Sequence, residues 1–155
     1  MSRFRIDVAD LLAHAGARRT VRLTEPVDDL ATSVSAAAGP VTVDLTLERI
    51  PEGIVVRGTV SGRWAGECSR CLAPLSEPLS VHVDELFEAH PVPDETYPIE
   101  GDEIDLDQLI RDAVLLDLPL APHCEPPCRV PGLDDAAEDD APRDPRWAAL
   151  SQLEL

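Results

Sequence analysis

The sequence contains no lysine, and all 13 of its basic residues are arginine. Aromatic residues make up only 3% of the chain, so a hydrophobic core must consist mostly of valine, leucine, isoleucine and alanine. No apolar run approaches the roughly 18 residues of a transmembrane helix, and the N-terminal residues lack the apolar segment of a secretory signal. We therefore expect a cytoplasmic protein without membrane contact, whose thiols stay reduced.

The common catalytic motifs are also missing. The chain has no G-x-S-x-G, no phosphate-binding G-x-x-x-x-G-K-[ST] loop and no G-x-G-x-x-G, and its four histidines do not have H-E-x-x-H spacing. Its carboxylates lie mainly in predicted loops and near the C-terminus, where they are typical of a solvated surface. The sequence therefore predicts a protein that is not an enzyme.

Acidic charge is concentrated in the second half of the chain. Residues 1–71 carry 9 Arg and 9 Asp or Glu, whereas residues 72–155 carry 4 Arg and 21 Asp or Glu, which accounts for the net charge of −17. Such a surface is repelled by bare phosphate backbone and is suited to a basic protein partner. The alternative is that the acidity only keeps the protein soluble.

The four cysteines lie in two close pairs. Cys68 and Cys71 have C-x-x-C spacing, and Cys124 and Cys128 have C-x₃-C spacing. Together they can supply a tetrahedral four-thiolate zinc site, with Zn–S distances of about 2.3 Å. The alternatives are small buried hydrophobes, a disulfide, and a thiol redox pair. His123 is a substitute ligand in principle, although a lone histidine beside a cysteine is more often a bystander.

Alternation of apolar and polar residues predicts an antiparallel sheet. It extends over three segments and, more weakly, over a fourth: residues 41–50, 54–64, 79–87 and 18–24. Pro51-Glu52-Gly53 predicts a turn that joins the first two segments as a hairpin. Residues 1–6 are expected to be an extended arm, and residues 32–40 and 90–101 to be connections.

Two helices are expected in the same domain. One covers residues 8–14 after the capping residue Asp7. The other covers residues 107–118, and its apolar stripe can cover the sheet. The predicted fold class is therefore α+β for residues 1–130: an antiparallel β-meander or barrel-like sheet, covered by a helix, with a metal knuckle formed by the cysteine pairs.

The C-terminal part has a different composition. Residues 131–143 form an acidic low-complexity segment that is typical of a flexible linker. Residues 144–155 predict a short helix, with Pro145 in its first turn and Trp147 on its apolar face. We expect this helix either to dock on the domain or to bind a partner.

Several motifs, taken in order, resemble one protein family. They are Glu67-Cys68-Ser69-Arg70-Cys71-Leu72, Asp84-Glu85-Leu86-Phe87, Asp102-Glu103-Ile104-Asp105-Leu106-Asp107-Gln108-Leu109-Ile110-Arg111-Asp112, Leu115-Leu116-Asp117-Leu118-Pro119-Leu120-Ala121-Pro122-His123-Cys124-Glu125-Pro126-Pro127-Cys128 and Asp144-Pro145-Arg146-Trp147-Ala148-Ala149-Leu150. This set resembles the YceD family, the large ribosomal RNA subunit accumulation proteins of bacteria and plastids, and the resemblance spans about residues 20–152. The resemblance implies a non-catalytic role in ribosome assembly, in which large-subunit ribosomal RNA accumulates.

The chain departs from that family's pattern at one place. Family members commonly continue after the second cysteine pair with Gly-Leu-Cys-x-x-Cys-Gly, whereas this chain reads Arg129-Val130-Pro131-Gly132-Leu133-Asp134-Asp135. Zinc binding here therefore requires that two cysteine pairs suffice.

The charge pattern suggests how such a factor would find its partner. We expect the main partner to be a basic large-subunit ribosomal protein or a pre-ribosomal particle. It would be bound through the 102–112 region, including Asp102 and Asp105, through the acidic tail at 134–140, and through Trp147. A secondary contact with ribosomal RNA is expected at the arginines near residue 20: Arg18, Arg19 and Arg22. The alternative function is a zinc- or thiol-dependent chaperone or redox protein that uses the first cysteine pair.

Overall fold

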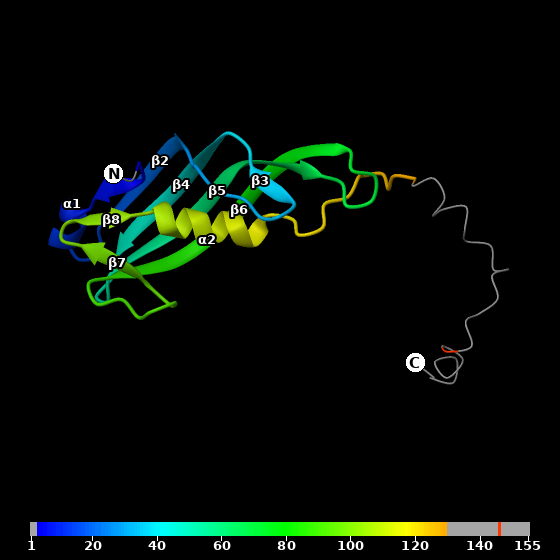
Figure 1. Ribbon diagram of the computed structural model, residues 1–155. Helices are drawn as coiled ribbons and strands as arrows, with labels where there is room; N and C mark the ends of the chain where they lie inside the picture. Colours follow the sequence, from blue (N-terminus) through cyan, green and yellow to red (C-terminus); the bar gives the residue numbers. More distant parts are fainter. Residues whose placement is uncertain (1–2, 130–145, 147–155) are drawn as a thin grey trace.

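The computed structural model describes residues 3–129 and Arg146. The elements, in chain order, are β1 (Arg5–Asp7), α1 (Ala9–Ala13), β2 (Arg18–Pro26), β3 (Ser35–Ala37), β4 (Pro40–Arg49), β5 (Ile54–Glu67), β6 (Pro74–Glu88), β7 (Tyr97–Glu100), β8 (Glu103–Asp105) and α2 (Asp107–Asp117) (Figure 1).

The strands form one sheet that curls into a half-barrel, in the order β1-β8-β7-β6-β5-β4-β2, with β3 paired to β5. Its centre is the meander β4-β5-β6, which the alternating segments predict. Every pairing of the named strands is antiparallel except one, because β6 and β7 run parallel where Phe87 and Glu88 lie opposite Tyr97 and Pro98. The prediction of an antiparallel barrel-like sheet is thus confirmed in part.

The alternation of the central strands places their apolar side chains in the core. On β4 the buried side chains are at every second position: Val41, Val43, Leu45 and Leu47. On β5 the same pattern skips Gly58, where a Cβ atom would lie 2.1 Å from the backbone oxygen of Asp44. Glycine at this position therefore allows β4 and β5 to stay in register through the curl of the sheet.

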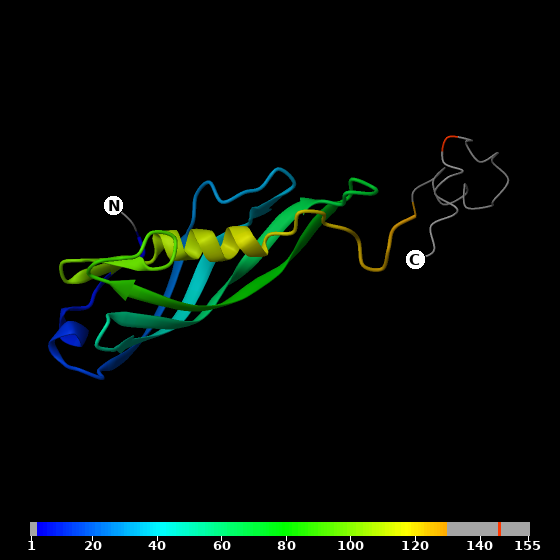
Figure 2. The ribbon, with the colours of Figure 1, turned by 90° about the horizontal axis from the view of Figure 1, so that it is seen from below.

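Helix α2 lies across the concave side of the half-barrel (Figure 2). It buries Leu109, Ile110 and Val114 against the sheet. The carboxylate of Asp105 accepts a hydrogen bond of 2.9 Å from the backbone N–H of Asp107, which satisfies a donor of the first turn. At residues 107–117 the helix closely follows the predicted bounds, and it packs mainly against β5 and β6.

Four short strands were not predicted as strands: three occupy segments predicted to be an arm or connections, and β8 occupies the segment just before the predicted helix. They are β1, β3, β7 and β8, each of only three or four residues. Segments of this length carry too few positions for an alternation to be recognised. Much of their pairing comes from neighbours distant in sequence: Ile104 on β8 pairs with Ile6 of β1, whereas its other partner, Ile99 of β7, is only five residues away.

The predicted linker at 131–143 and the predicted helix at 144–155 lie outside the described residues, apart from Arg146. The domain division therefore stays a prediction. Within the described part, neither helix is both long and apolar enough to span a bilayer.

Candidate metal centre

The first cysteine pair sits at the tip of the long β5–β6 hairpin. The strand pairing ends where Glu67 lies opposite Pro74, and the backbone N–H of Cys68 then donates to the carbonyl of Ala73 at 2.9 Å. The N–H of Leu72 donates back to the carbonyl of Cys68, also at 2.9 Å, and Leu72 has a φ of 59°. This tight turn buries Cys68 and leaves Cys71 exposed.

Two serines hold the segment that carries the second pair. The backbone N–H and the side-chain hydroxyl of Ser69 both donate to the carbonyl of Pro122, at 2.7 and 2.8 Å. The buried hydroxyl of Ser35 on β3 donates to the carbonyl of Pro119 at 2.9 Å. The chain that leaves α2 is thereby fixed against the hairpin just before Cys124.

The four sulfur atoms form one cluster. Cys68 Sγ lies 3.7 Å from Cys128 Sγ, Cys71 Sγ lies 3.6 Å from Cys124 Sγ, and all four lie within 4.8 Å of one another. Tetrahedral ligands at zinc–sulfur distances of about 2.3 Å are about 3.8 Å apart. The predicted clustering is confirmed, and the cysteines are free thiols rather than disulfides in this structure.

Hydrogen bonding distinguishes the thiols from one another. The backbone N–H groups of Cys71 and then Arg70 stabilise the thiolate of Cys68 and lower its pKa to about 6. The hydrogen bond with Cys71, followed by that with Cys68, raises the pKa of Cys124 to about 12. The Cys68 thiol, with its lowered pKa, thus lies beside two thiols of raised pKa, Cys124 and Cys128. A divalent cation completes such a set by displacing the thiol protons.

The donor set fits zinc. Four sulfurs in a tetrahedral arrangement select Zn²⁺ or iron in an iron–sulfur site, and four protein ligands make a closed, structural site rather than a catalytic one. His123 is exposed, its Nδ1 lies 3.3 Å from the carbonyl oxygen of Ala121, and it does not belong to the cluster. A third cysteine pair is not needed to complete this tetrahedron.

The three arginines near residue 20 do not form one patch. Arg18 and Arg22 project from one face of β2, whereas Arg19 projects from the other. Each pairs with an acidic residue of the chain itself: Arg18 with Glu48 at 2.6 Å, Arg19 with Asp10 at 2.9 Å, and Arg22 with Asp44 at 3.8 Å. An RNA contact at these residues stays a prediction, and it would compete with those ion pairs.

The 102–112 region is partly neutralised within the molecule. Asp105 lies 3.9 Å from the guanidinium of Arg5, and Asp107 forms an ion pair of 2.8 Å with Arg111. The side chain of Asp102 is exposed, and its backbone oxygen accepts a hydrogen bond from Val8. Trp147 lies outside the described residues, and the predicted role of these residues in partner binding is untested.

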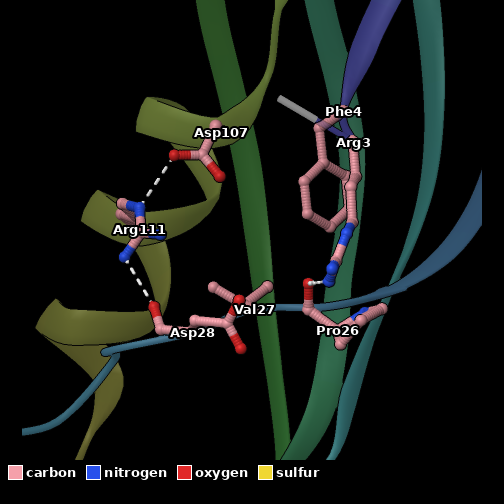
Figure 3. Close-up of a pocket in the computed structure, with 7 residues that line it drawn as sticks. All are labelled: Arg3, Phe4, Pro26, Val27, Asp28, Asp107 and Arg111. Carbon is pink, nitrogen blue, oxygen red and sulfur yellow. Dashed lines mark hydrogen bonds and ion pairs between the residues drawn. The ribbon is translucent and has the colours of Figure 1, made fainter. Parts of the chain in front are cut away.

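A pocket of about 370 Å³ lies between Arg3 and Phe4, which precede β1, and the start of α2 (Figure 3). At its rim Arg111 bridges the carboxylate of Asp107 and, at 2.9 Å, the carbonyl of Asp28. On the other side Arg3 donates to the carbonyl of Pro26 at 3.4 Å. These polar groups bond to one another, and the hydrogen bond from Arg111 to Asp28 connects the segment after β2 to the helix.

Sequence reasoning missed a second feature, a groove between α2 and β6–β7. It is lined by carboxylates that lie far apart in the sequence: Glu85, Asp94, Glu95 and Asp112. Asp112 accepts hydrogen bonds from the Tyr97 hydroxyl at 2.9 Å and from Gln108 at 2.8 Å. A two-residue parallel pairing brings Tyr97 beside β6, and no local sequence pattern signals such a pairing.

The chain is similar to known proteins over the region that contains the motifs quoted above. Residues 56–154 match the family model described as "Large ribosomal RNA subunit accumulation protein YceD". An uncharacterized protein of Mycobacterium tuberculosis (strain ATCC 25618 / H37Rv) is 37% identical over 126 residues, covering 72% of this chain and 60% of that protein. An uncharacterized protein of Mycobacterium leprae (strain TN) is 34% identical over 131 residues, covering 74% and 59%.

The uncharacterized protein YlbN of Bacillus subtilis (strain 168) is 30% identical over 108 residues, covering 61% of this chain and 63% of that protein. The chain therefore spans about 60% of the length of the curated relatives that it matches. No solved structure matches it.

The matched region contains both cysteine pairs, α2 and most of the β5–β6 hairpin. It covers more than half of the chain, and the mycobacterial similarity extends over nearly three quarters of it. The chain therefore belongs to the YceD family of large ribosomal RNA subunit accumulation proteins.

Proposed function

We propose that this protein is a non-catalytic ribosome-assembly factor, needed for the accumulation of large-subunit ribosomal RNA. It acts by binding a basic large-subunit ribosomal protein or an assembly particle. The observation that supports this proposal is the match of residues 56–154 to a family whose name refers to the accumulation of large-subunit ribosomal RNA. The activity and partners of the whole protein are part of the proposal.

The charge distribution supports a protein partner over bare RNA. All of the net charge of −17 falls in residues 72–155. The arginines of β2 are engaged by acidic neighbours. Contact with a lysine- and arginine-rich surface brings complementary fields together, whereas contact with phosphates brings like charges together.

Zinc has a structural role in this proposal. Cys68, Cys71, Cys124 and Cys128 would hold it, and the metal would join the hairpin tip to the segment that follows α2. Binding free energy at such a site is folding free energy. The metal would thus stabilise the shape of this end of the domain without taking part in a reaction.

Co-sedimentation tests the proposal. Affinity-tagged full chain is expected to migrate with precursors of the large subunit in a sucrose gradient, and to copurify with a basic large-subunit protein. Loss of the protein is expected to reduce large-subunit ribosomal RNA more than small-subunit RNA. Migration only at the top of the gradient, with ribosomal RNA levels unchanged in its absence, would refute the assignment.

A thiol redox protein is the second candidate, favoured by the exposed side chain of Cys71 in a C-x-x-C turn. The two candidates differ in how their thiols react. A redox pair should react with a thiol reagent at once. A zinc-bound cluster should react only after a chelator has removed the metal.

A further inference from the structure

Strand β6 has a long open edge. On one side it pairs with β5 continuously from Pro74 to Phe87. On the other side it pairs with β7 only at Phe87 and Glu88. Within the described part of the chain, no strand pairs with residues 74–86 on that side, and Figure 2 shows this edge of β6 running past α2.

The pairing determines which backbone groups face this edge. Because β6 pairs with β5 without a bulge, its N–H groups point alternately toward β5 and away from it. Glu88 lies opposite Pro98, which has no N–H to donate, so the parallel pairing there must use the N–H and C=O of Glu88. The backbone groups of Glu88 therefore point toward β7 and away from β5. By the same alternation the part of the open edge from Ser80 to Asp84 carries the N–H and C=O groups of three residues: Ser80, His82 and Asp84.

Prolines on β6 agree with this assignment. Pro74 and Pro78 are separated from His82 by even numbers of residues, so their nitrogen atoms face the open side. The absence of an N–H at these positions therefore removes no hydrogen bond between β6 and β5. These prolines remove two of the three donors, at positions 74, 76 and 78, that the edge near the hairpin tip would otherwise have. The part that can accept a further strand is therefore the part beside α2.

An apolar cavity of about 220 Å³ lies between this edge and α2. Its apolar lining comes from Val81 and Val83 of β6 and from the helix, where it includes Leu109 and Leu116. The Leu116 side chain is 88% exposed, although it lies next to buried apolar neighbours. A helix beside an open strand edge, with an apolar cavity between them, is a geometry that accepts extended peptides.

The cavity continues into an acidic end, defined as Glu85, Asp94, Glu95 and Asp112. The acidic cavity has about 510 Å³ and shares Glu85, Tyr97 and Asp112 with the apolar one. None of the four carboxylates forms an ion pair with any residue that the structure describes. We call the apolar cavity, the acidic end and the open edge from Ser80 to Asp84 together the edge groove.

We propose that the edge groove binds an extended segment of a basic protein, which adds to β6 as a further strand. This inference rests on the proposed function and specifies its binding surface. The open backbone groups pair with the segment, an apolar side chain enters the cavity, and an arginine or lysine reaches the acidic end. Val81 and Glu85 are about 13 Å apart along a strand, so the apolar and basic side chains are about four residues apart.

Charge selects this occupant over two others. The chain's own residues 131–155 include an acidic run from Asp134 to Asp140, which the acidic end would repel. A second copy carries the same net charge of −17, and it would bring Asp84 and Glu85 of both edges together. Charges on an exposed edge discourage such self-pairing.

The first test uses matched variants of the full chain and the RNA-free proteins extracted from bacterial large ribosomal subunits. His82→Pro removes a donor from the open edge, and Ser76→Pro is its control on the same side of β6, outside the cavities. Leu116→Asp places a charge in the apolar cavity, and Leu120→Asp is its control, because Leu120 is 79% exposed and lines no part of the groove.

The unaltered chain and both controls are expected to retain the same basic protein. His82→Pro and Leu116→Asp are expected to weaken its binding at least tenfold, with unchanged circular dichroism. Equal binding by these two variants would overturn the groove assignment and leave the proposed function standing. If His82→Pro fails to fold, Leu116→Asp decides. If the unaltered chain retains no ribosomal protein and does not co-sediment with particles, the proposed function fails and the groove assignment with it.

The second test identifies the occupant. A photoreactive p-benzoylphenylalanine is placed at His82, or at Thr20 on the far edge of the sheet, and the chain is irradiated with large-subunit particles. Position 82 is expected to cross-link to an arginine- or lysine-bearing segment of a basic protein, and position 20 is not. Cross-links from position 82 to the chain's own residues 147–153, to a second copy or to RNA would contradict the proposal.

Discussion

Ser69 connects the two halves of the cysteine cluster through a single acceptor. Its N–H and its hydroxyl converge on the carbonyl of Pro122, so the C-x-x-C turn holds the other segment independently of any metal. Outer hydrogen bonds of this kind set the orientation of metal ligands. The side chain between the two cysteines of the first pair is therefore part of the site.

The substitution Ser69→Ala tests this role. It removes the hydroxyl bond and keeps the N–H bond, which should lower the free energy of unfolding by about 1 kcal/mol. Metal affinity should fall roughly tenfold, as is typical when a supporting hydrogen bond is lost. Thermal unfolding and competition with a chelator measure the two effects. Ser80→Ala, an exposed serine on the same hairpin, is the control and should change neither value.

Glu85 is unfavourably placed in the isolated protein. Burial, and then the negative charges of Asp84 and Asp112, raise the pKa of its carboxyl group. Its ionised form is thus less stable in the folded than in the unfolded state. The resulting loss of stability is present at neutral pH and disappears as the pH falls through the raised pKa.

Glu85→Gln is therefore expected to stabilise the free protein at pH 7, by about 0.5 kcal/mol. The gain should vanish below the pKa of Glu85, where the native side chain is protonated, and urea unfolding at several pH values measures this. The same variant should bind the basic partner more weakly, because one carboxylate of the acidic end is gone. A variant that is less stable at pH 7 would show that Glu85 has a stabilising partner instead.

The hairpin β5–β6 determines where the metal site lies. Its two strands stay paired until Glu67 and Pro74, well beyond the predicted end at residue 64, and this extension carries Cys68 and Cys71 away from the core. The core residues of β4 are buried without any contribution from the cysteines. Loss of the metal should therefore loosen one end of the molecule and leave the half-barrel folded.

Chelation and the substitution Cys68→Ser test this expectation. Both should lower the Tm, because metal binding contributes folding free energy. Amide hydrogen exchange should accelerate in residues 68–73 and 119–128, while the central amides of β4 stay protected. Elemental analysis that finds no zinc in protein purified under reducing conditions would contradict the metal assignment.

The sequence predicts the elements whose signal is local. The strands β4, β5 and β6 follow from alternation, α2 follows from its apolar stripe, and the cysteine cluster follows from paired spacing. The short strand β7 and the edge groove cannot be predicted from local patterns, because they depend on where residues 90–101 contact β6 in the folded chain. The parallel pairing of Tyr97 with Phe87, supported by ring stacking at 5.2 Å, is decided only in the folded chain.

The described part of the molecule is a half-barrel, and the net negative charge of the chain falls in the second half of the sequence. The acidic groups that face the edge groove form no ion pair with a described residue, whereas acidic groups near Arg5 and Arg18 form ion pairs with these arginines. Association with a basic partner should therefore be strong at low salt and weak at high salt, because exposed charges are screened within about 10 Å at 0.1 M ionic strength.

Two sets of neutralising variants test the origin of this attraction. Neutralising Asp134, Asp135, Glu138, Asp139 and Asp140 together is expected to weaken partner binding at low salt and to leave the fold intact. Neutralising Arg18 and Arg22 is expected to have little effect on that binding. Tight binding of naked ribosomal RNA fragments, abolished by the arginine changes and insensitive to the acidic ones, would show that RNA is the main partner.

The position of the metal knuckle has a consequence for everything that follows it in the chain. In the proposed zinc site Cys128 is the last ligand, so bound zinc would fix the point from which residues 130–155 begin. Without the metal, the last held residue moves back to Pro122, and six more residues add about 20 Å of reach when extended. The local concentration of the C-terminal segment at any site on the domain falls as such a connection lengthens. Zinc occupancy would thereby set how often that segment, with Trp147, meets the same surfaces that a partner uses.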